Sequence, residues 1–465
     1  MALGKRVPQQ EEMFVPVTDL PKSPAHPFYN RLNQLLAEEG FDEFVEALCE
    51  PYYKTGGRPS IPPGVYFRML FIGYFEGIDS QRGIAWRCAD SRSLREFLGA
   101  ALTDATPAHN SMTVIRQRLP GSLFEAVFEK VLALLGQRGL LKGKTLGIDA
   151  TTLEANAAMK TIVRKADGQD WKNYLRTLAQ AEGIEEPTDD DLRRIDRGRK
   201  EKKVSNETWE SPTDGDARIA RMKDGTTRLA YKAEHAVDLE TSAIVNAQVT
   251  HANRGDAETG PESLILAQVE LVKAGSAATV MEVVADKGYH DNRLLAACVR
   301  LGVRSYIPER KQAKRIWTNK PAELEAAFRA NRRRVRGERG RKLNRWRSER
   351  VERTFAHVCE TGGGRRAWLR GLESVQKSHL MRCCAYNLGL VMRKCFGIGK
   401  PRGGAVAAAG LLALTAALMA ALSVSGSLLG QPSGLTSYAL GLLVISATAC
   451  YIASSYGLSR QKGAF

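Results

Sequence analysis

Two aspartates stand at positions from which they could share a metal ion. Asp149 closes a predicted strand at 145–149, and Asp286 closes another at 279–286. If these strands run parallel as neighbours, their carboxylates lie side by side at one sheet edge, where open α/β sheets place their sites. Carboxylate oxygens are the ligands that Mg²⁺ and Mn²⁺ prefer. The sequence therefore predicts a divalent metal site at this edge.

A third carboxylate could come from a helix predicted from about residue 346 to 358. This helix carries both Glu349 and Glu352, and spacing alone does not choose between them. Two metal ions held roughly 3.5 to 4 Å apart can activate a water or a 3′-hydroxyl and stabilise the departing oxygen of a phosphodiester. Three converging acids would therefore suit metal-dependent cleavage of a nucleic-acid strand.

The charge of the chain indicates a polyanionic partner. The 465 residues include 68 Lys and Arg and 51 Asp and Glu, a formal net charge of +17. Fifteen of the basic residues lie between Arg310 and Arg347, against three acids. We expect this basic stretch to be a track for DNA phosphates, and a solvated charge run is the alternative. The expected phosphate contacts within it are Arg332, Arg333, Arg334, Arg336, Arg339 and Arg341.

Residues 1–135 are predicted to form a small all-α domain that binds DNA ends. Four segments indicate helices: apolar residues recur at helical spacing in the first two, and the last two open with a serine suited to N-capping. The last segment could be a recognition helix that brings Arg116 and Arg118 to DNA, and a plain packing helix is the alternative. The segments are 28–48, 65–75, 91–98 and 111–119.

Residues 140–398 have the pattern of an α/β domain. The predicted elements follow the order β, β, β, α, β, α, β, α, and the first and fourth strands end at the two aspartates. A charged insertion at about 159–225 is predicted to be a helical excursion with a basic loop. The later strands are 227–238, 243–249, 279–286 and 303–308, and the helices are 261–274, 292–301 and 346–358.

Three motifs resemble the acidic motifs of DDE transposases from bacterial insertion sequences. They are Asp149-Ala-Thr-Thr-Leu-Glu-Ala-Asn-Ala157, Ala285-Asp-Lys-Gly-Tyr-His290 and Val351-Glu-Arg-Thr-Phe-Ala-His-Val358. The stretch from Gly57 to Val65 is similar to the N-terminal transposase domain of that family. The resemblance implies an RNase H-like mixed sheet in which the first and fourth strands are adjacent. It also implies Asp149, Asp286 and Glu352 as the catalytic acids, which would bind two Mg²⁺ or Mn²⁺ ions.

The surroundings of the glutamate depart from the family pattern. Many relatives have the spacing Tyr-x2-Arg-x3-Glu-x6-Lys, and here Arg345, Ser348 and Cys359 occupy the three other positions. Neighbouring side chains are therefore expected to take over the phosphate contacts. Lys287 and Tyr289 could touch the scissile phosphate or shape the turn between them. The other candidates are Arg347, Arg350, Arg353, Arg365 and Arg366.

The predicted function is that of a transposase, an enzyme that binds the ends of its insertion sequence, cleaves the DNA and transfers the strand to target DNA. A nuclease with the same acids, or a non-catalytic DNA-binding protein derived from a transposase, is the alternative. The predicted partners are the transposon ends, the target DNA and, by family analogy, a second copy of the chain.

The C-terminal tail at 403–465 differs from the rest of the sequence. No charged residue occurs from Gly403 to Ser459, and 405–454 could form a membrane hairpin with both ends in the cytoplasm. A pair of Ala-rich helices packed on the protein, or a tail appended by chance in the reading frame, is the alternative. The N-terminus shows no secretory signal, and the eight cysteines show no CxxC pair. We therefore expect a cytoplasmic, nucleoid-associated protein that the tail could tether to a membrane.

Overall fold

The computed structural model describes residues 26–399 and 401, apart from 55, 58–59, 102, 200–203, 223, 311–316 and 319. The chain divides after Ile398 into two units, of which the first contains nearly all the described residues. The tail at 403–465, with the predicted membrane hairpin, lies outside the described residues. Among the helices that are described, none is long and apolar enough to cross a membrane.

The N-terminal region is helical, as predicted. Gly40, in the left-handed region at a φ of 58°, ends the first helix, so the segment predicted at 28–48 is two helices. Ser91 caps its helix through Leu94 N–H as expected, whereas the prediction of Ser111 as a cap is wrong, because the helix already begins at His109. The helices are α1 (Pro27–Glu38), α2 (Phe41–Cys49), α3 (Pro63–Glu76), α4 (Gln81–Asp90), α5 (Arg92–Phe97), α6 (His109–Arg118) and α7 (Gly121–Gln137).

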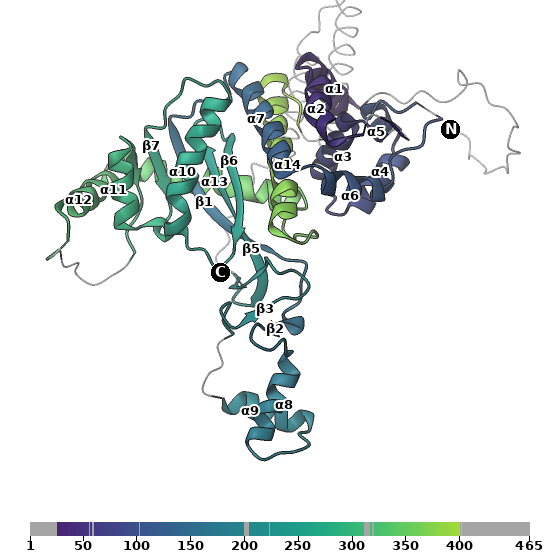
Figure 1. The fold of residues 1–465 in the computed structure, drawn as a ribbon. Helices are drawn as coiled ribbons and strands as arrows, with labels where there is room; N and C mark the ends of the chain where they lie inside the picture. Colours follow the sequence, from purple (N-terminus) through teal and green to yellow (C-terminus); the bar gives the residue numbers. More distant parts are fainter. Residues whose placement is uncertain are drawn as a thin grey trace, which may run out of the picture. The chain divides into compact units, whose positions relative to one another are not determined.

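The apolar helix α3 lies at the centre of this region. Its side chains are buried on most sides, including Phe67 and Phe71, which are fully covered. The long helix α14 (Leu372–Phe396) packs against α3, α7 and the β-sheet (Figure 1). The core is therefore continuous from the N-terminal helices to the sheet.

A mixed sheet forms the second half of the core. Its strands are β1 (Thr145–Glu154), β4 (Arg218–Arg221), β5 (Thr227–Asp238), β6 (Ile244–His251), β7 (Glu282–Ala285) and β8 (Arg304–Tyr306). Their order is β4-β5-β1-β7-β8, and β6 also pairs with β5. Strand β1 runs antiparallel to β5 and parallel to β7. The prediction that the first strand lies beside the strand leading to Asp286 is confirmed.

Helices cover both faces of the sheet. Successive side chains of a strand point to opposite faces. On β5, Glu234 bonds to Ser263 of α10 (Asp256–Lys273), and the next residue, His235, bonds to Thr354 of α13 (Glu338–Phe355). Helices α10 and α13 therefore lie on opposite faces, and α11 (Asn292–Arg300) and α12 (Ala322–Arg336) pack beside β8.

The basic stretch is more helical than the sequence indicated. Helix α12 was not predicted, and α13 begins at Glu338 rather than near residue 346. The many arginines hide the apolar spacing, because only Phe328 and Leu343 are large apolar side chains that these segments bury before Val351. Helix α10 also begins earlier than predicted, at Asp256, and it contains Pro261.

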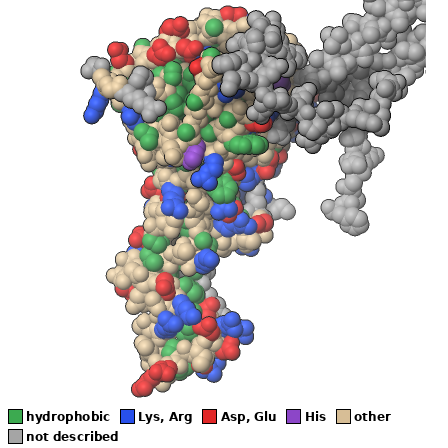
Figure 2. All heavy atoms as spheres, turned by 90° about the vertical axis from the view of Figure 1, so that its right-hand side faces the viewer, with side chains coloured by type: hydrophobic (Ala, Val, Ile, Leu, Met, Phe, Trp, Pro, Cys, Tyr) green, Lys and Arg blue, Asp and Glu red, His purple; other side chains and the backbone are tan. Residues whose placement is uncertain are grey.

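The described part of the charged insertion includes a pair of short strands and two α-helices. They are β2 (Val163–Arg164), β3 (Trp209–Glu210), α8 (Trp171–Ala181) and α9 (Asp189–Gly198). A small apolar cluster around Leu175 and Ile195 joins α8 to α9, and Thr188 and Asp191 form a capping box at the start of α9. In Figure 2 this lower part of the molecule carries acidic and basic side chains side by side. The segment also contributes β4 to the main sheet.

Candidate active site

The sheet places Asp149 and Asp286 on neighbouring strands. The prediction that Asp149 closes a strand at 145–149 is wrong, because β1 pairs with β5 as far as Glu154, whereas β7 does end just before Asp286. The parallel register of β1 and β7 ends at Ile148 opposite Ala285, so the two aspartates are the next residues on each strand. Paired neighbouring strands lie about 4.8 Å apart, and this spacing brings the two chains together up to Ile148 and Ala285, directly before the aspartates. Both side chains are partly exposed. The edge therefore presents two carboxylates to whatever binds there.

Helix α13 crosses the sheet next to Asp149. Its Val351 packs over Gly147, where an added Cβ would lie 2.7 Å from Val351 Cγ2, so only glycine allows this approach. One turn earlier, Arg347 places Nη1 2.5 Å from Asp149 Oδ2. Both side chains of this ion pair are largely buried, at 12% and 19% exposed. In this structure a cation thus already neutralises the first aspartate.

The orientation of α13 favours Glu352 over Glu349 as the third acid. Each residue turns the helix by about 100°. Measured from the buried Val351, Glu352 is therefore about 100° around the helix axis, whereas Glu349 is about 200° around it and faces away from the sheet. Glu349 is exposed and pairs with Arg353 at 3.0 Å. Glu352 is also exposed, at the edge of the face that covers the sheet. This distinction needs the packing of the helix, which the sequence alone does not show.

The structure does not draw the three acids into one tight cluster. Within the described part of the chain, one group of three metal-ligand side chains has all its ligand atoms within 4.8 Å of one another. That group consists of His235, His379 and Cys383, all buried, and sequence reasoning missed it. His235 is the residue opposite Asp149 in the β1–β5 register, so the group lies directly beside the candidate site.

Hydrogen bonds define this histidine group. Thr354 Oγ1 donates to Val351 O at 2.8 Å, and it can therefore accept from His235 Nδ1 at 2.9 Å. This leaves His235 Nε2 as the acceptor for His379 Nε2, at 2.8 Å. Burial lowers the pKa of His235 well below its usual value and that of His379 to about 3, so both rings are neutral at pH 7. The bonds tie β5, α13 and α14 together beside Asp149.

A second buried polar network lies on the α10 face of the sheet. Glu234 accepts hydrogen bonds from Thr259 Oγ1 and Tyr289 Oη, both at 2.7 Å. Lys232 Nζ lies 2.8 Å from Asp256 Oδ1 and 3.5 Å from the Glu234 carboxylate. Tyr289 is 1% exposed. The prediction that Tyr289 contacts DNA is therefore corrected. Its hydroxyl donates to Glu234 inside the protein, and the buried ring supports the turn after Asp286.

The turn after Asp286 brings a further carboxylate to the edge. Asp286 Oδ1 accepts from Gly288 N–H at 2.6 Å. A Cβ on Gly288 would lie 2.5 Å from Asp256 Oδ2 and 2.8 Å from Asp286 Oδ1, so both carboxylates crowd this glycine. Lys287 is exposed and remains a candidate phosphate contact. The sequence analysis missed Asp256, because the helix was predicted to begin only at residue 261 and Asp256 is the first residue of α10.

The six predicted arginines of the basic stretch differ in their surroundings. Arg334 is half-buried and donates to Ser305 O at 2.9 Å, which fits a structural role rather than a DNA contact. Arg339 pairs with the buried Glu282. Arg332 pairs with Glu309 at 2.7 Å. The exposed members of the set are Arg332, Arg333, Arg336, Arg339 and Arg341.

The other predicted arginines already have neighbours. Arg350 is half-buried, with its guanidinium 4.2 Å from the centre of the Trp346 ring. Arg353, Arg365 and Arg366 are exposed. They contact, in turn, Glu349, Glu360 and the ring of Trp368.

The predicted recognition helix presents one of its two arginines to solvent. Arg118 is exposed and lies 4.7 Å from the centre of the Tyr53 ring. Arg116 instead turns into a cavity, where its Nε and Nη1 atoms are buried. The prediction that both arginines share a DNA-facing surface is therefore corrected, because α6 packs with Arg116 inward.

Two family models match the chain. Residues 18–118 match a family described as a transposase domain (DUF772), and residues 206–388 match the transposase DDE domain. The second match contains Asp286 and Glu352 and begins after Asp149. No curated protein and no solved structure was found to match. Since both matches are to transposase domains and together cover more than half of the sequence, the chain belongs to the DDE transposases, which act in DNA transposition.

Proposed function

We propose that Asp149, Asp286 and Glu352 are the catalytic acids with which this transposase cleaves the ends of its element and transfers the strand. The observation that carries the proposal is the parallel pairing of β1 with β7, because the two aspartates directly follow the last paired residues, Ile148 and Ala285. Glu352 supports the proposal as the third acid because it follows Val351, the residue that packs on Gly147, two positions before Asp149. All three side chains reach solvent in part, as a site for DNA requires.

The donor set fits a divalent metal ion, as the family uses. All the candidate ligands are hard carboxylate oxygens, which suit Mg²⁺ or Mn²⁺ rather than softer metals. When bound, two such ions would supply Lewis acidity and lower the pKa of a nucleophilic water. Arg347 holds the Asp149 carboxylate in place before DNA arrives, and it is positioned to bind a phosphate beside that carboxylate.

The exposed arginines of α12 and α13 would guide DNA to these acids. Arg333, Arg336 and Arg341 lie on the helices that lead to Glu352, and Lys287 follows Asp286 directly. Each phosphate that they neutralise releases counterions, so binding should weaken steeply with salt. The combined variant Arg333→Ala, Arg336→Ala should lower the slope of log affinity against log salt concentration by about 2. An unchanged slope would remove these arginines from the DNA surface.

The test of the acids is cleavage of DNA that carries the ends flanking the gene. Asp149→Asn, Asp286→Asn and Glu352→Gln should each abolish Mg²⁺-dependent nicking and strand transfer while DNA binding stays within about twofold. The matched control is Glu349→Gln, three residues away on the same helix, which should cleave normally. Full activity of Glu352→Gln, or loss of activity in Glu349→Gln alone, would contradict the assignment.

The same assay separates the alternatives. Strand joining into target DNA establishes a transposase reaction, whereas hydrolysis without joining indicates a nuclease. DNA binding without any cut, with the same affinity in all three acid variants, indicates a non-catalytic DNA-binding protein.

We also infer a homodimer, because two element ends must be held together during transposition. Light scattering of the DNA complex should give two chains for two ends. Removal of residues 403–465 followed by membrane fractionation tests tethering by the tail, and a cytoplasmic chain would remain soluble with and without it.

A further inference from the structure

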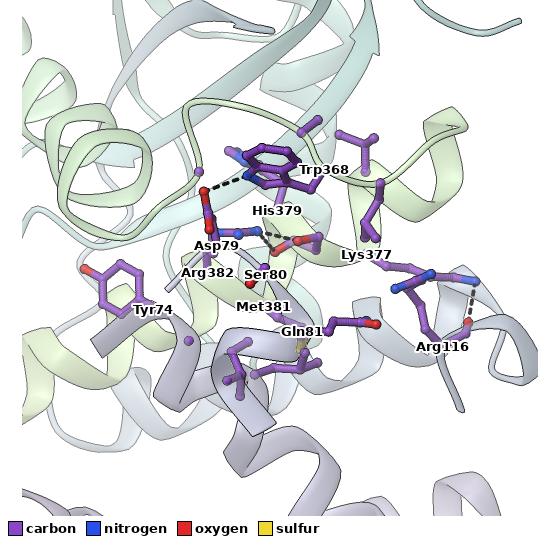
Figure 3. Close-up of a pocket in the computed structure, with 18 of the residues that line it drawn as sticks. Tyr74, Asp79, Ser80, Gln81, Arg116, Trp368, Lys377, His379, Met381 and Arg382 are labelled. Carbon is purple, nitrogen blue, oxygen red and sulfur yellow. Dashed lines mark hydrogen bonds between the residues drawn. The ribbon is translucent and has the colours of Figure 1, made fainter. Parts of the chain in front are cut away.

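A cavity of about 230 Å³ lies where the N-terminal helices meet β1 and α14 (Figure 3). Helices α3, α4, α6 and α14 contribute to its walls together with the segment 364–369. Asp79, Ser80 and Trp368 are exposed lining residues and mark its mouth. The space is far larger than the roughly 10–15 Å³ that one water needs. It can therefore hold a sizeable chemical group.

Arg116 reaches into this cavity from α6. Its Nε and Nη1 atoms are buried and have no hydrogen-bond partner among the described residues. Burial also lowers the pKa of this guanidinium. Buried N–H groups of a charged side chain are normally paired. The cavity is therefore incomplete without an acceptor opposite Arg116.

The other charged groups of the cavity do not supply this acceptor. Among the described lining residues, four are cations and one is an acid, Asp79. Asp79 Oδ2 is engaged by Trp368 Nε1 at 2.6 Å. Lys377 Nζ donates to Leu119 O at 2.8 Å and forms an ion pair with Glu373 at 2.7 Å, so this ammonium group already has an acceptor and a counter-charge. The excess of positive charge indicates an anionic ligand.

The remaining walls are largely apolar and include four aromatic side chains. Tyr66, Tyr74, Phe124 and Trp368 all line the cavity, and Trp368 is 43% exposed at the mouth. Aromatic side chains bind nucleic-acid bases by stacking, and arginine binds phosphate through paired N–H groups. We propose that this cavity binds a nucleotide unit of a DNA strand, with the phosphate on Arg116 and the base against the aromatic wall.

The cavity is close enough to the candidate active site for one strand to reach both. Leu153 of β1 lines the cavity, and Asp149 lies four residues earlier, which is about 13 Å along a strand. Backbone bonds hold the mouth segment on β1, with Glu154 N–H donating to Arg365 O and Ala367 N–H to Glu154 O. This use of a DNA strand rests on the proposed function.

Binding is tested on the full chain carrying Glu352→Gln, in EDTA, so that no cleavage occurs. The probes are deoxyadenosine monophosphate, deoxyadenosine and inorganic phosphate, followed by calorimetry and by tryptophan fluorescence, to which Trp368 contributes. The monophosphate should bind at least tenfold more tightly than the nucleoside. Adding Arg116→Gln should weaken it at least tenfold, Arg116→Lys less, and the control change Arg31→Gln on α1, which lies outside the cavity lining, should have no effect.

Binding by the chain that retains Arg116 can be measured even if the Arg116 variants fail to fold. If it binds neither the monophosphate nor phosphate, the proposal is overturned. A second arm asks where the nucleotide comes from. End-containing DNA should displace the bound monophosphate, and Arg116→Gln should weaken DNA binding at least tenfold. If DNA does not displace the bound monophosphate, the cavity is a site for a free nucleotide, and the proposal that it binds a DNA strand is overturned.

The two proposals fail separately. If cleavage depends on the three acids but the chain binds no monophosphate, the catalytic proposal stands and the cavity proposal is refuted. Monophosphate binding that depends on Arg116, in a chain whose cleavage ignores the acids, would do the reverse.

Discussion

Replacement of Glu282 by Gln should destabilise the protein at neutral pH and have little effect in acid. Glu282 is a buried residue of β7, four positions before Asp286. Burial alone would raise its pKa, but hydrogen bonds from Arg339, Thr145 and Tyr306 and the charge of Arg339 outweigh this effect. They lower the pKa from 4.5 to about 2. The carboxylate thereby ties β7 to the first turn of α13.

The size of the effect follows from this change in pKa. Each pKa unit corresponds to about 1.4 kcal/mol, so the lowered pKa of Glu282 is equivalent to about 3 kcal/mol. Arg339 is 59% exposed, and solvent screening reduces the expected loss to about 2 kcal/mol. Because the folded-state pKa is the lower one, this stability is complete above about pH 4.5. It is lost as the pH falls from about 4.5 to about 2.

Urea denaturation of the native chain and of Glu282→Gln, at several pH values, measures this difference. The two free energies of unfolding should differ by about 2 kcal/mol at pH 7, and the gap should narrow by about 1 kcal/mol by pH 3.5. The control is Glu349→Gln, whose exposed pair with Arg353 should contribute less than about 1 kcal/mol at any pH. A gap for Glu282→Gln that is independent of pH would refute the reasoning.

Two further substitutions test how α13 is seated on the sheet. Gly147→Ala should cost about 1–3 kcal/mol and slow DNA cleavage, because its Cβ would collide with Val351. Urea denaturation should show no such loss for Gly255→Ala, which has open space around it, and equal stability of both variants would contradict the packing. Thr354→Val keeps the shape of the side chain but leaves His235 Nδ1 without its partner, so it should cost about 1–3 kcal/mol. Thermal denaturation should show recovery in Thr354→Ser, and a stable Thr354→Val would exclude the hydrogen bond as a support.

Local patterns in the sequence predicted much of the fold. The hairpin expected at 227–238 and 243–249 is present at Thr227–Asp238 and Ile244–His251, because its apolar alternation is a property of each strand alone. The same kind of pattern indicated that Asp149 and Asp286 follow apolar runs. Predictions of this type depend on neighbours within a few residues. The structure confirms the strand end before Asp286, whereas β1 continues past Asp149 to Glu154.

The arginine-rich stretch shows where local patterns failed. Helix α12 has few apolar residues to mark its buried face, and its structure depends on packing beside β8 and α11. Arg334 and Arg339 looked alike in the sequence as DNA contacts. Their actual neighbours, Ser305 and Glu282, are distant in sequence and come together only on the sheet.

The sequence by itself determined the composition of the site: two aspartates after apolar strands, a glutamate on a late helix and a large excess of arginine. Only the tertiary structure decided which groups meet. It set Arg347 against Asp149, 198 residues away, and His235 against Thr354, 119 residues away, and it turned Arg116 inward. The physical reason is range, because hydrophobic periodicity and turn chemistry act within a few residues, whereas these contacts arise from the register of β1 between β5 and β7 and from the seating of helices on the sheet.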